Sequence, residues 1–233
     1  MATRQLLDQH RRDLDELVRI AHNDLALYFR QFDTIEAART ALMDVLPQLI
    51  AIYGSAAVAL GADWYDEVRE AAGARGRFRA IPGDLHDAGS AYSLAGWAAT
   101  EARDVSTMKD LVAGGVQKRI ADMDRHSVRR SAVADPSSAG WKRIGAGSCE
   151  FCQMLIGRDQ LYSEATADFA SHTNCKCQAY PVIDGAEPID VKDYVQSQRN
   201  AQNVGESDEA YQRRREADRA RVREWIANNP NAG

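Results

Sequence analysis

Residues 6–32 read LLDQHRRDLDELVRIAHNDLALYFRQF, and the spacing of their apolar side chains predicts a helix. After a first gap of seven, the apolar residues recur at intervals of 4, 3, 4, 3 and 4, which keeps them on one face of an α-helix. They are Leu7, Leu14, Val18, Ala21, Leu25, Tyr28 and Phe32. Charged residues fill the other faces, so the fold begins with an amphipathic helix that needs a partner.

A second helical stripe follows at once. Asp33 and Thr34 stand between the two stripes and are suited to cap the second helix. Pro47 lies inside the second stripe and predicts a kink or a break there. The stripe consists of Ile35, Ala38, Leu42, Val45, Leu49, Ile52, Ala56 and Leu60. Residues 33–73 carry seven acidic and two basic residues, which predicts an acidic outer face.

Two further helices are expected after a Gly- and Pro-punctuated linker at residues 73–83. The first covers residues 84–102, with Leu85, Tyr92, Leu94 and Trp97 as its larger apolar side chains. The second runs from about Ser106 towards Val133, with Asp110 placed as a first-turn acid. If they are exposed, Gly114 and Gly115 weaken it by roughly 1 kcal/mol each relative to Ala.

The C-terminal half of this last helix is basic. Its cations are Lys118, Arg119, Arg125, Arg129 and Arg130. They are interpreted either as a strip that faces phosphates or, preferably, as charge that complements the C-terminal end of a helix. His10, His22 and His126 lie in charged helical contexts and are interpreted as surface residues.

Asp135-Pro-Ser-Ser-Ala-Gly140 is the best domain boundary, because short β-like pieces, turns and all the cysteines follow it. The sequence predicts a mainly α protein in three parts. Residues 1–134 form an amphipathic helical domain, and residues 135–189 form a small α+β Cys/His module of zinc-ribbon type. Residues 190–233 form a charged helical tail.

The composition excludes several classes of protein. With 233 residues, 45% hydrophobic and 27% charged, the chain is neither disordered throughout nor collagen-like. A net charge of −5 argues against a protein coated in basic residues, and four cysteines are too few for a disulfide-stapled secreted fold. No stretch reaches the roughly 20 uninterrupted apolar residues of a membrane span, and the N-terminus lacks a signal-peptide core. We therefore expect a soluble protein, made in a reducing cytoplasm, without membrane contact.

The cysteines gather in one cluster. Cys149-Glu-Phe-Cys152 is followed, after nineteen residues, by His172-Thr-Asn-Cys175-Lys-Cys177. A Cys-x2-Cys knuckle places two thiolates on one side of a turn, where they can hold a tetrahedral ion. The second short group supplies the remaining ligands. A structural Zn²⁺ is therefore the preferred interpretation.

The ligand set stays open, because five candidates compete for four positions. An all-cysteine site leaves His172 outside the ligand set, whereas three cysteines plus His172 leave Cys175 or Cys177 free. In an extended segment Cys175 and Cys177 point to the same face, which favours both as ligands. The alternatives to zinc are disulfides, unligated core cysteines, and a cysteine nucleophile with His172 as base. No triad partner or nucleotide-binding motif is evident, so no catalytic or cofactor-binding residue is assigned.

The cluster and its surroundings resemble a known family. Gly147–Arg158, Leu161-Tyr-Ser163 and His172–Val182 are similar in order and spacing to the minor head proteins of tailed phages. The resemblance is greatest to the Mu F-like head morphogenesis proteins of actinobacterial phages and covers residues 141–183. In that family the Cys-x2-Cys lies on a short helix and a His-x2-Cys-x-Cys strand closes the module.

The resemblance implies a low-copy protein in the virion interior, associated with the portal vertex and made in the host cytoplasm. Its implied partners are the portal protein or the major capsid protein, further copies of itself and the packaged DNA. Such proteins are often described as capsid maturation proteases, although no protease centre is evident here. A structural capsid component rather than an enzyme is therefore expected. A maturation protease is the first alternative, and a DNA-binding accessory protein that uses residues 118–130 is the second.

Overall fold

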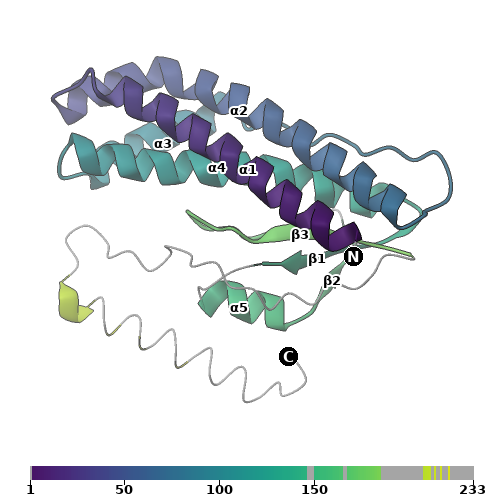
Figure 1. Ribbon diagram of the computed structural model, residues 1–233. Coiled ribbons are helices and arrows are strands. Elements are labelled where there is room, and N and C mark those ends of the chain that lie inside the picture. The colour runs from purple at the N-terminus through teal and green to yellow at the C-terminus, as the bar shows by residue number, and fades with distance from the viewer. Residues whose placement is uncertain are drawn as a thin grey trace.

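The computed structural model describes residues 2–145, 150–164 and 167–184, together with residues 207–210, 213, 216 and 220. Long helices form a bundle, and a small antiparallel sheet packs against it (Figure 1). The elements are α1 (Ala2–Phe29), α2 (Ile35–Ala71), α3 (Ala88–Glu101), α4 (Val105–Ala134), β1 (Ser138–Ile144), α5 (Glu150–Gly157), β2 (Leu161–Tyr162) and β3 (Gln178–Ile183). The predicted mainly α fold with a small α+β Cys/His module is confirmed.

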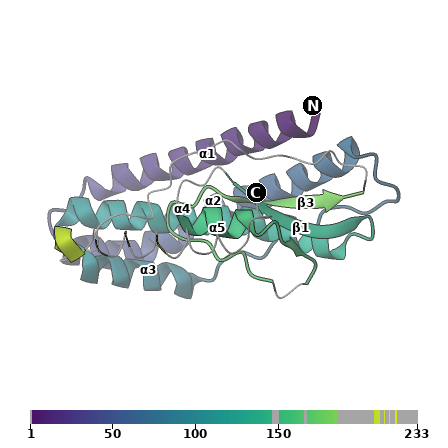
Figure 2. The same ribbon diagram turned by 90° about the horizontal axis from the view of Figure 1, so that it is seen from below.

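The elements are arranged in layers. α4 packs along α2, and α1 and α3 lie at opposite sides of this pair (Figure 2). The sheet has the strand order β2-β1-β3 and contacts the bundle through α4. α5 lies beyond the sheet, on the side away from the bundle (Figure 1). The sheet is thus placed between the helical bundle and α5.

The first predicted stripe faces the core of the bundle. Its side chains from Leu7 to Leu25 are buried. At the end of α1 the buried aromatic residue is Phe29, whereas Tyr28 is partly buried and donates its hydroxyl to the carbonyl of Ala41. This bond and the packing of Phe29 join the end of α1 to the start of α2.

α2 begins as predicted but differs later. The Thr34 hydroxyl accepts a hydrogen bond from the backbone N–H of Ala37 at 3.2 Å, as expected of an N-cap. Of the kink or break predicted at Pro47, the break is wrong, since α2 continues through this residue, and the kink stays a prediction. The predicted stripe is wrong at Ile52, which is 66% exposed, and at Ala56, which is also exposed, while Leu60 packs against the core. Ile50 and Ala57 are buried in their place. Apolar side chains surround this part of α2, so periodicity does not identify the face that packs.

By length and composition alone, α2 meets the requirement of a membrane span, which differs from the sequence-based expectation. In the described part of the chain it is the one helix that does so. It packs against α1, α3 and α4, and the core helix of a soluble bundle has the same composition. The lack of membrane contact stays a prediction.

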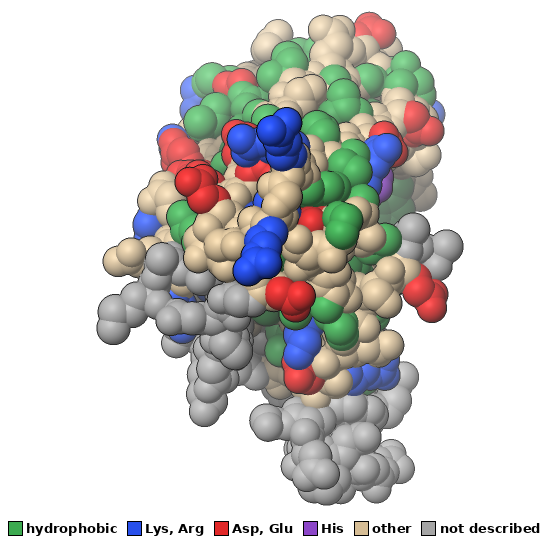
Figure 3. All heavy atoms as spheres, turned by 90° about the vertical axis from the view of Figure 1, so that its right-hand side faces the viewer, with side chains coloured by type: hydrophobic (Ala, Val, Ile, Leu, Met, Phe, Trp, Pro, Cys, Tyr) green, Lys and Arg blue, Asp and Glu red, His purple; other side chains and the backbone are tan. Residues whose placement is uncertain are grey.

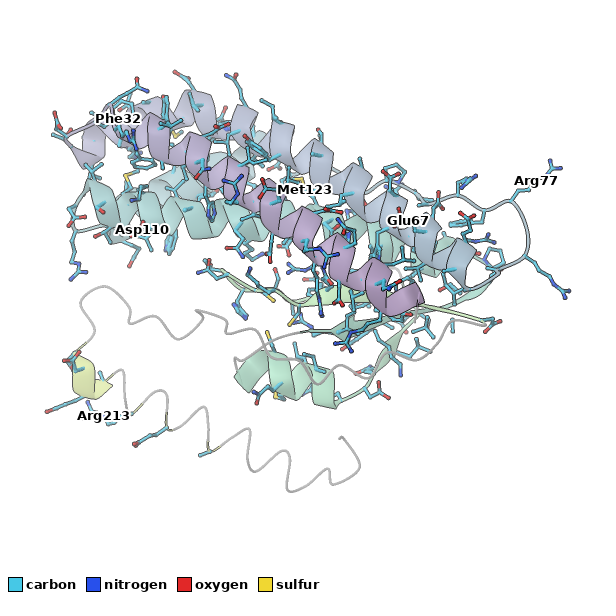
Figure 4. The ribbon with its side chains drawn as sticks, in the orientation of Figure 1. Phe32, Glu67, Arg77, Asp110, Met123 and Arg213 are labelled. Atoms are coloured by element: carbon cyan, nitrogen blue, oxygen red, sulfur yellow. The ribbon has the colours of Figure 1, made fainter. Side chains whose placement is uncertain are left out.

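Small residues allow the central helices to approach closely. A Cβ atom at Gly61 would lie 2.5 Å from the carbonyl oxygen of Asp124 on α4. Gly54 faces Met123, whose side chain lies inside the bundle in Figure 4. Gly115 lies against Leu94 of α3. Gly114 and Gly115 are buried, so they serve close packing between elements instead of weakening an exposed helix.

Gly61→Ala is expected to destabilise the protein by about 1–3 kcal/mol, because the added methyl group meets backbone atoms that cannot rotate away. Gly96→Ala is the matched control: its Cβ meets no atom within 4 Å, so the higher helix propensity of Ala should stabilise α3 by up to about 1 kcal/mol. Urea unfolding of both variants measures the two effects. Equal stabilities of the two variants would contradict the close approach of α2 and α4.

The segment before α3 and the caps of the next helices also differ from prediction. α3 begins at Ala88, so Leu85 precedes it. Of its larger apolar side chains, Leu94 is buried, whereas Tyr92 and Trp97 are exposed. α4 is capped by Asp104, which accepts from the N–H of Thr107. Asp110 therefore lies beyond the first turn.

In the predicted linker, Arg77 points away from the molecule into solvent (Figure 4).

Two hydrophobic clusters make up the core. The first lies within the helical bundle and contains residues of all four long helices. The second joins Leu7, Trp64 and Val128 of the bundle to Trp141 and Tyr180 of the sheet. The predicted boundary at residue 135 coincides with the end of α4, yet side chains on both sides of it pack together. The division into three domains stays a prediction.

Candidate metal centre

Two segments bring the predicted ligands together beside the sheet. Cys152 lies in the first turn of α5, and its side chain is fully buried. His172 and Cys175 lie at the ends of a tight turn that precedes β3, closed by a 3.1 Å hydrogen bond from the N–H of Cys175 to the carbonyl of His172. Asn174 takes a φ of 60° inside this turn, a conformation that asparagine tolerates. The turn therefore presents His172 and Cys175 to the same side.

The distances within this group suit a tetrahedral ion. Cys152 Sγ lies 3.2 Å from His172 Nε2 and 3.9 Å from Cys175 Sγ, and all three atoms lie within 4.8 Å of one another. Zinc–sulfur bonds of about 2.3 Å and zinc–nitrogen bonds of about 2.0 Å place tetrahedral ligand atoms roughly 3.5–3.8 Å apart. Cys152, His172 and Cys175 could therefore hold a metal ion.

His172 already has the tautomer that a metal requires. Its Nδ1 lies 2.7 Å from the carbonyl oxygen of Thr173. A carbonyl accepts only, so Nδ1 carries the proton. In the neutral form of the ring the lone pair then lies on Nε2, the nitrogen that faces Cys152. This arrangement fixes the ring before any ion binds.

Cys177 lies close to the group and is also buried. A Cβ at Gly145 would lie 2.6 Å from the Cys177 sulfur, so only glycine at the end of β1 leaves room for this thiol. Hydrogen bonds from Cys152 and Cys177 hold the pKa of Cys175 far below its ordinary value. The pKa of Cys177 is raised to about 12. The hydrogen bond with Cys152 by itself would lower this pKa, but the hydrogen bond with Cys175, burial and the charge of Cys175 together raise it by more.

The predicted ligands are thus brought together as far as the structure describes them. Cys149 lies outside the described residues, and the choice between the two ligand sets stays a prediction. Cys152, Cys175 and Cys177 are free thiols, so no disulfide joins these three.

Two arginines missed as site residues surround the cluster. Arg125 on α4 donates from Nε to the carbonyl of Cys177 and from Nη2 to the carbonyl of Cys175, both at 2.8 Å. Arg143 on β1 donates from Nη1 to Cys152 Sγ at 3.8 Å. Both arginines are buried. The sequence does contain a signal for Arg143. Arg143 and Trp141 are two residues apart in a β-like stretch, so in a strand their side chains lie on the same face.

The other basic residues of α4 have partners within the molecule. Lys118 pairs with Asp122 at 2.6 Å, Arg119 donates to Ser90, and Arg130 pairs with Asp84 at 3.0 Å. Arg129 lies over the ring of Trp141. Figure 3 shows an end of the molecule on which acidic and basic side chains are interspersed. The interpretation of residues 118–130 as a strip that faces phosphates is therefore wrong for Arg125 and has no support from the others.

The interpretation of His10 as a surface residue is wrong. Its ring is buried and stacks on Trp64, with centroids 4.3 Å apart and planes at 9°. His10 Nε2 lies 3.2 Å from a carboxylate oxygen of Asp124, which is equally buried. This pair joins α1 to α4, beside the second hydrophobic cluster.

The helical bundle, the small sheet and the cysteine cluster together define the structural class of the protein. It is a mainly helical protein with a small Cys/His module suited to a metal ion. The model of the VG15 protein family matches residues 1–225, and the chain belongs to this family of phage-related proteins. Comparison with curated proteins gives no match. Comparison with solved structures gives none either.

Proposed function

We propose that the protein is a minor capsid component that acts structurally during head assembly of a tailed phage. Its place is the virion interior, at the portal vertex, and its partners are the portal or major capsid protein and further copies of itself. Membership of a phage family supports this role, and so does the resemblance of residues 141–183 to minor head proteins. The arrangement of Cys152, His172 and Cys175 is the observation that carries the proposal, because it belongs to the module that carries the resemblance.

The metal in this proposal is zinc, with a structural role. Zinc is the ion typical of closed tetrahedral sites built from thiolates and imidazole. The sheet has three strands, of which β2 has two residues, and so buries little surface of its own. An ion that links α5 to the turn before β3 would hold this module against the bundle.

Capsids purified away from tails are expected to contain the protein in far fewer copies than the major capsid protein. A phage that lacks the gene should produce defective heads, and supply of the wild-type gene should restore them. Quantitative mass spectrometry of the particles and a count of filled heads by electron microscopy measure both results. A protein confined to the lysate, with normal heads in its absence, would contradict a structural role in the capsid.

A maturation protease is the second candidate, and one distance favours it. Cys152 Sγ and His172 Nε2 lie 3.2 Å apart, as a nucleophile and its base do. Against this role, the Cys152 side chain is fully buried, whereas a nucleophile needs an open side for its substrate. A folded His172→Ala variant that still assembles heads but no longer cleaves a capsid protein would favour the protease.

A further inference from the structure

Arg143 and Arg125 bring two positive charges into the interior beside the cysteines. Their exposed fractions are 6% and 1%. The ring of Phe169 lies between them, with its centroid 3.9 Å from the guanidinium carbon of Arg143 and 4.7 Å from that of Arg125. Buried charges are costly unless an opposite charge lies nearby, so each guanidinium needs a counter-ion.

Arg125 has such a counter-ion. Its Nη1 lies 2.8 Å from a carboxylate oxygen of Asp122. Its other donors are used by the carbonyls of Cys175 and Cys177, which accept hydrogen bonds without contributing charge. Asp122 also pairs with Lys118 at 2.6 Å. The single negative charge of this carboxylate is thus already shared between two cations.

Arg143 differs from Arg125 in this respect. Its Nη2 donates to the carbonyls of Phe169 and Ala170, and its Nη1 donates to Cys152 Sγ at 3.8 Å. Among the residues that the structure describes, no carboxylate forms an ion pair with Arg143. Of the described side chains, the one that accepts from Arg143 and can become negative is therefore that of Cys152.

The charge of the centre follows from the ligands. A Zn²⁺ ion with two thiolates and neutral ligands is uncharged overall, whereas three thiolates give a net charge of −1 and four give −2. An uncharged centre would leave Arg143 buried without a counter-ion, and a thiolate-rich centre supplies one. The same arginine would in turn favour the negative centre over an uncharged one.

We propose that Arg143 is the counter-ion of a net-negative metal centre with at least three cysteinate ligands, and so acts as a positioning residue for Cys152. The inference rests on the zinc centre proposed above. It assigns a role to the positive charge of Arg143, distinct from the packing of its side chain.

Zinc affinity, measured by competition with a chromophoric chelator on the full-length protein, tests this role. Arg143→Met is expected to weaken zinc binding by about 10–100-fold. Arg143→Lys keeps the charge and should restore most of the affinity. Arg119→Met is the matched control, because this half-buried arginine of α4 donates only to Ser90 and to its own helix and should bind zinc as the wild type does.

Two results would overturn the inference. One is a folded Arg143→Met variant that binds zinc as tightly as the wild type. The other is an Arg143→Lys variant as weak as Arg143→Met, which would show that charge is not the cause. If Arg143→Met does not fold, a folded Arg143→Lys variant that binds zinc at least about 10-fold more weakly than the wild type overturns the inference, and one that binds it as tightly supports it. A wild-type protein that binds no zinc would instead refute the metal centre itself.

Discussion

Cys175→Ser is expected to retain almost no zinc, against one ion per chain in the unsubstituted protein. A serine hydroxyl is a poor zinc ligand at neutral pH, and Cys175 is one of the three residues of the described cluster, with its sulfur 3.9 Å from that of Cys152. Metal binding contributes about 10–16 kcal/mol in isolated zinc-finger peptides. Loss of the ion releases α5 from the turn before β3, so we expect the variant to lose the order of β1 and β3. The helices α1–α4 should stay folded, because they share a hydrophobic cluster of their own.

Elemental mass spectrometry after purification under reducing conditions measures the zinc, and hydrogen exchange of β1 and β3 measures the loss of order. His22→Ala is the control: this histidine of α1 binds the carbonyl of Ala113, so its loss should leave the zinc content unchanged. A wild-type protein without zinc and with all its thiols reactive would refute the zinc centre. Zinc retained by Cys177→Ser but lost by His172→Ala would identify the ligand set of three cysteines plus histidine.

His10→Leu is expected to destabilise the protein by about 3–5 kcal/mol. The substitution leaves the carboxylate of Asp124 buried without its imidazole partner, at a side-chain exposure of 1%. It also removes the stacking of His10 on Trp64. Urea unfolding, followed by circular dichroism, measures the loss.

A double-mutant cycle separates the pair from the packing. Asp124→Asn alone and the His10→Leu/Asp124→Asn double variant should show that much of the cost disappears once no carboxylate remains. His22→Leu is a matched control on the same helix, since it loses one hydrogen bond and leaves no charge behind. A His10→Leu variant no less stable than His22→Leu would refute a stabilising role for the buried pair.

The first helix could be predicted because its apolar stripe lies on one face and charged residues fill the others. In α1 the spacing of Leu14, Val18 and Leu25 identified the buried face. In α2 the same method failed at Ile52, since apolar residues surround the helix and packing against Gly54 and Gly61 decides its orientation. The spacing of apolar residues shows which faces of a helix can be buried. Which of these faces is buried depends on how the neighbouring helices pack against it.

The candidate site could be predicted as far as local spacing determines it. The His-x2-Cys spacing corresponds to a four-residue turn, so His172 and Cys175 lie together wherever that turn forms. Arg143 could not be assigned, because its partner Cys152 comes from another element. His10 was misjudged for the same reason, because its partner Asp124 is distant along the chain.

The second hydrophobic cluster has a consequence for the time at which the chain can fold. Leu7, near the start of α1, and Ile183, at the end of β3, pack in this one cluster. During synthesis this cluster can therefore be completed only after nearly the whole described chain has left the ribosome. Until then the residues of α1 and α2 in the cluster lack the part of their packing that the sheet supplies, and contacts so distant in sequence form slowly. A nascent chain of this topology depends on protection from aggregation until β3 has been made.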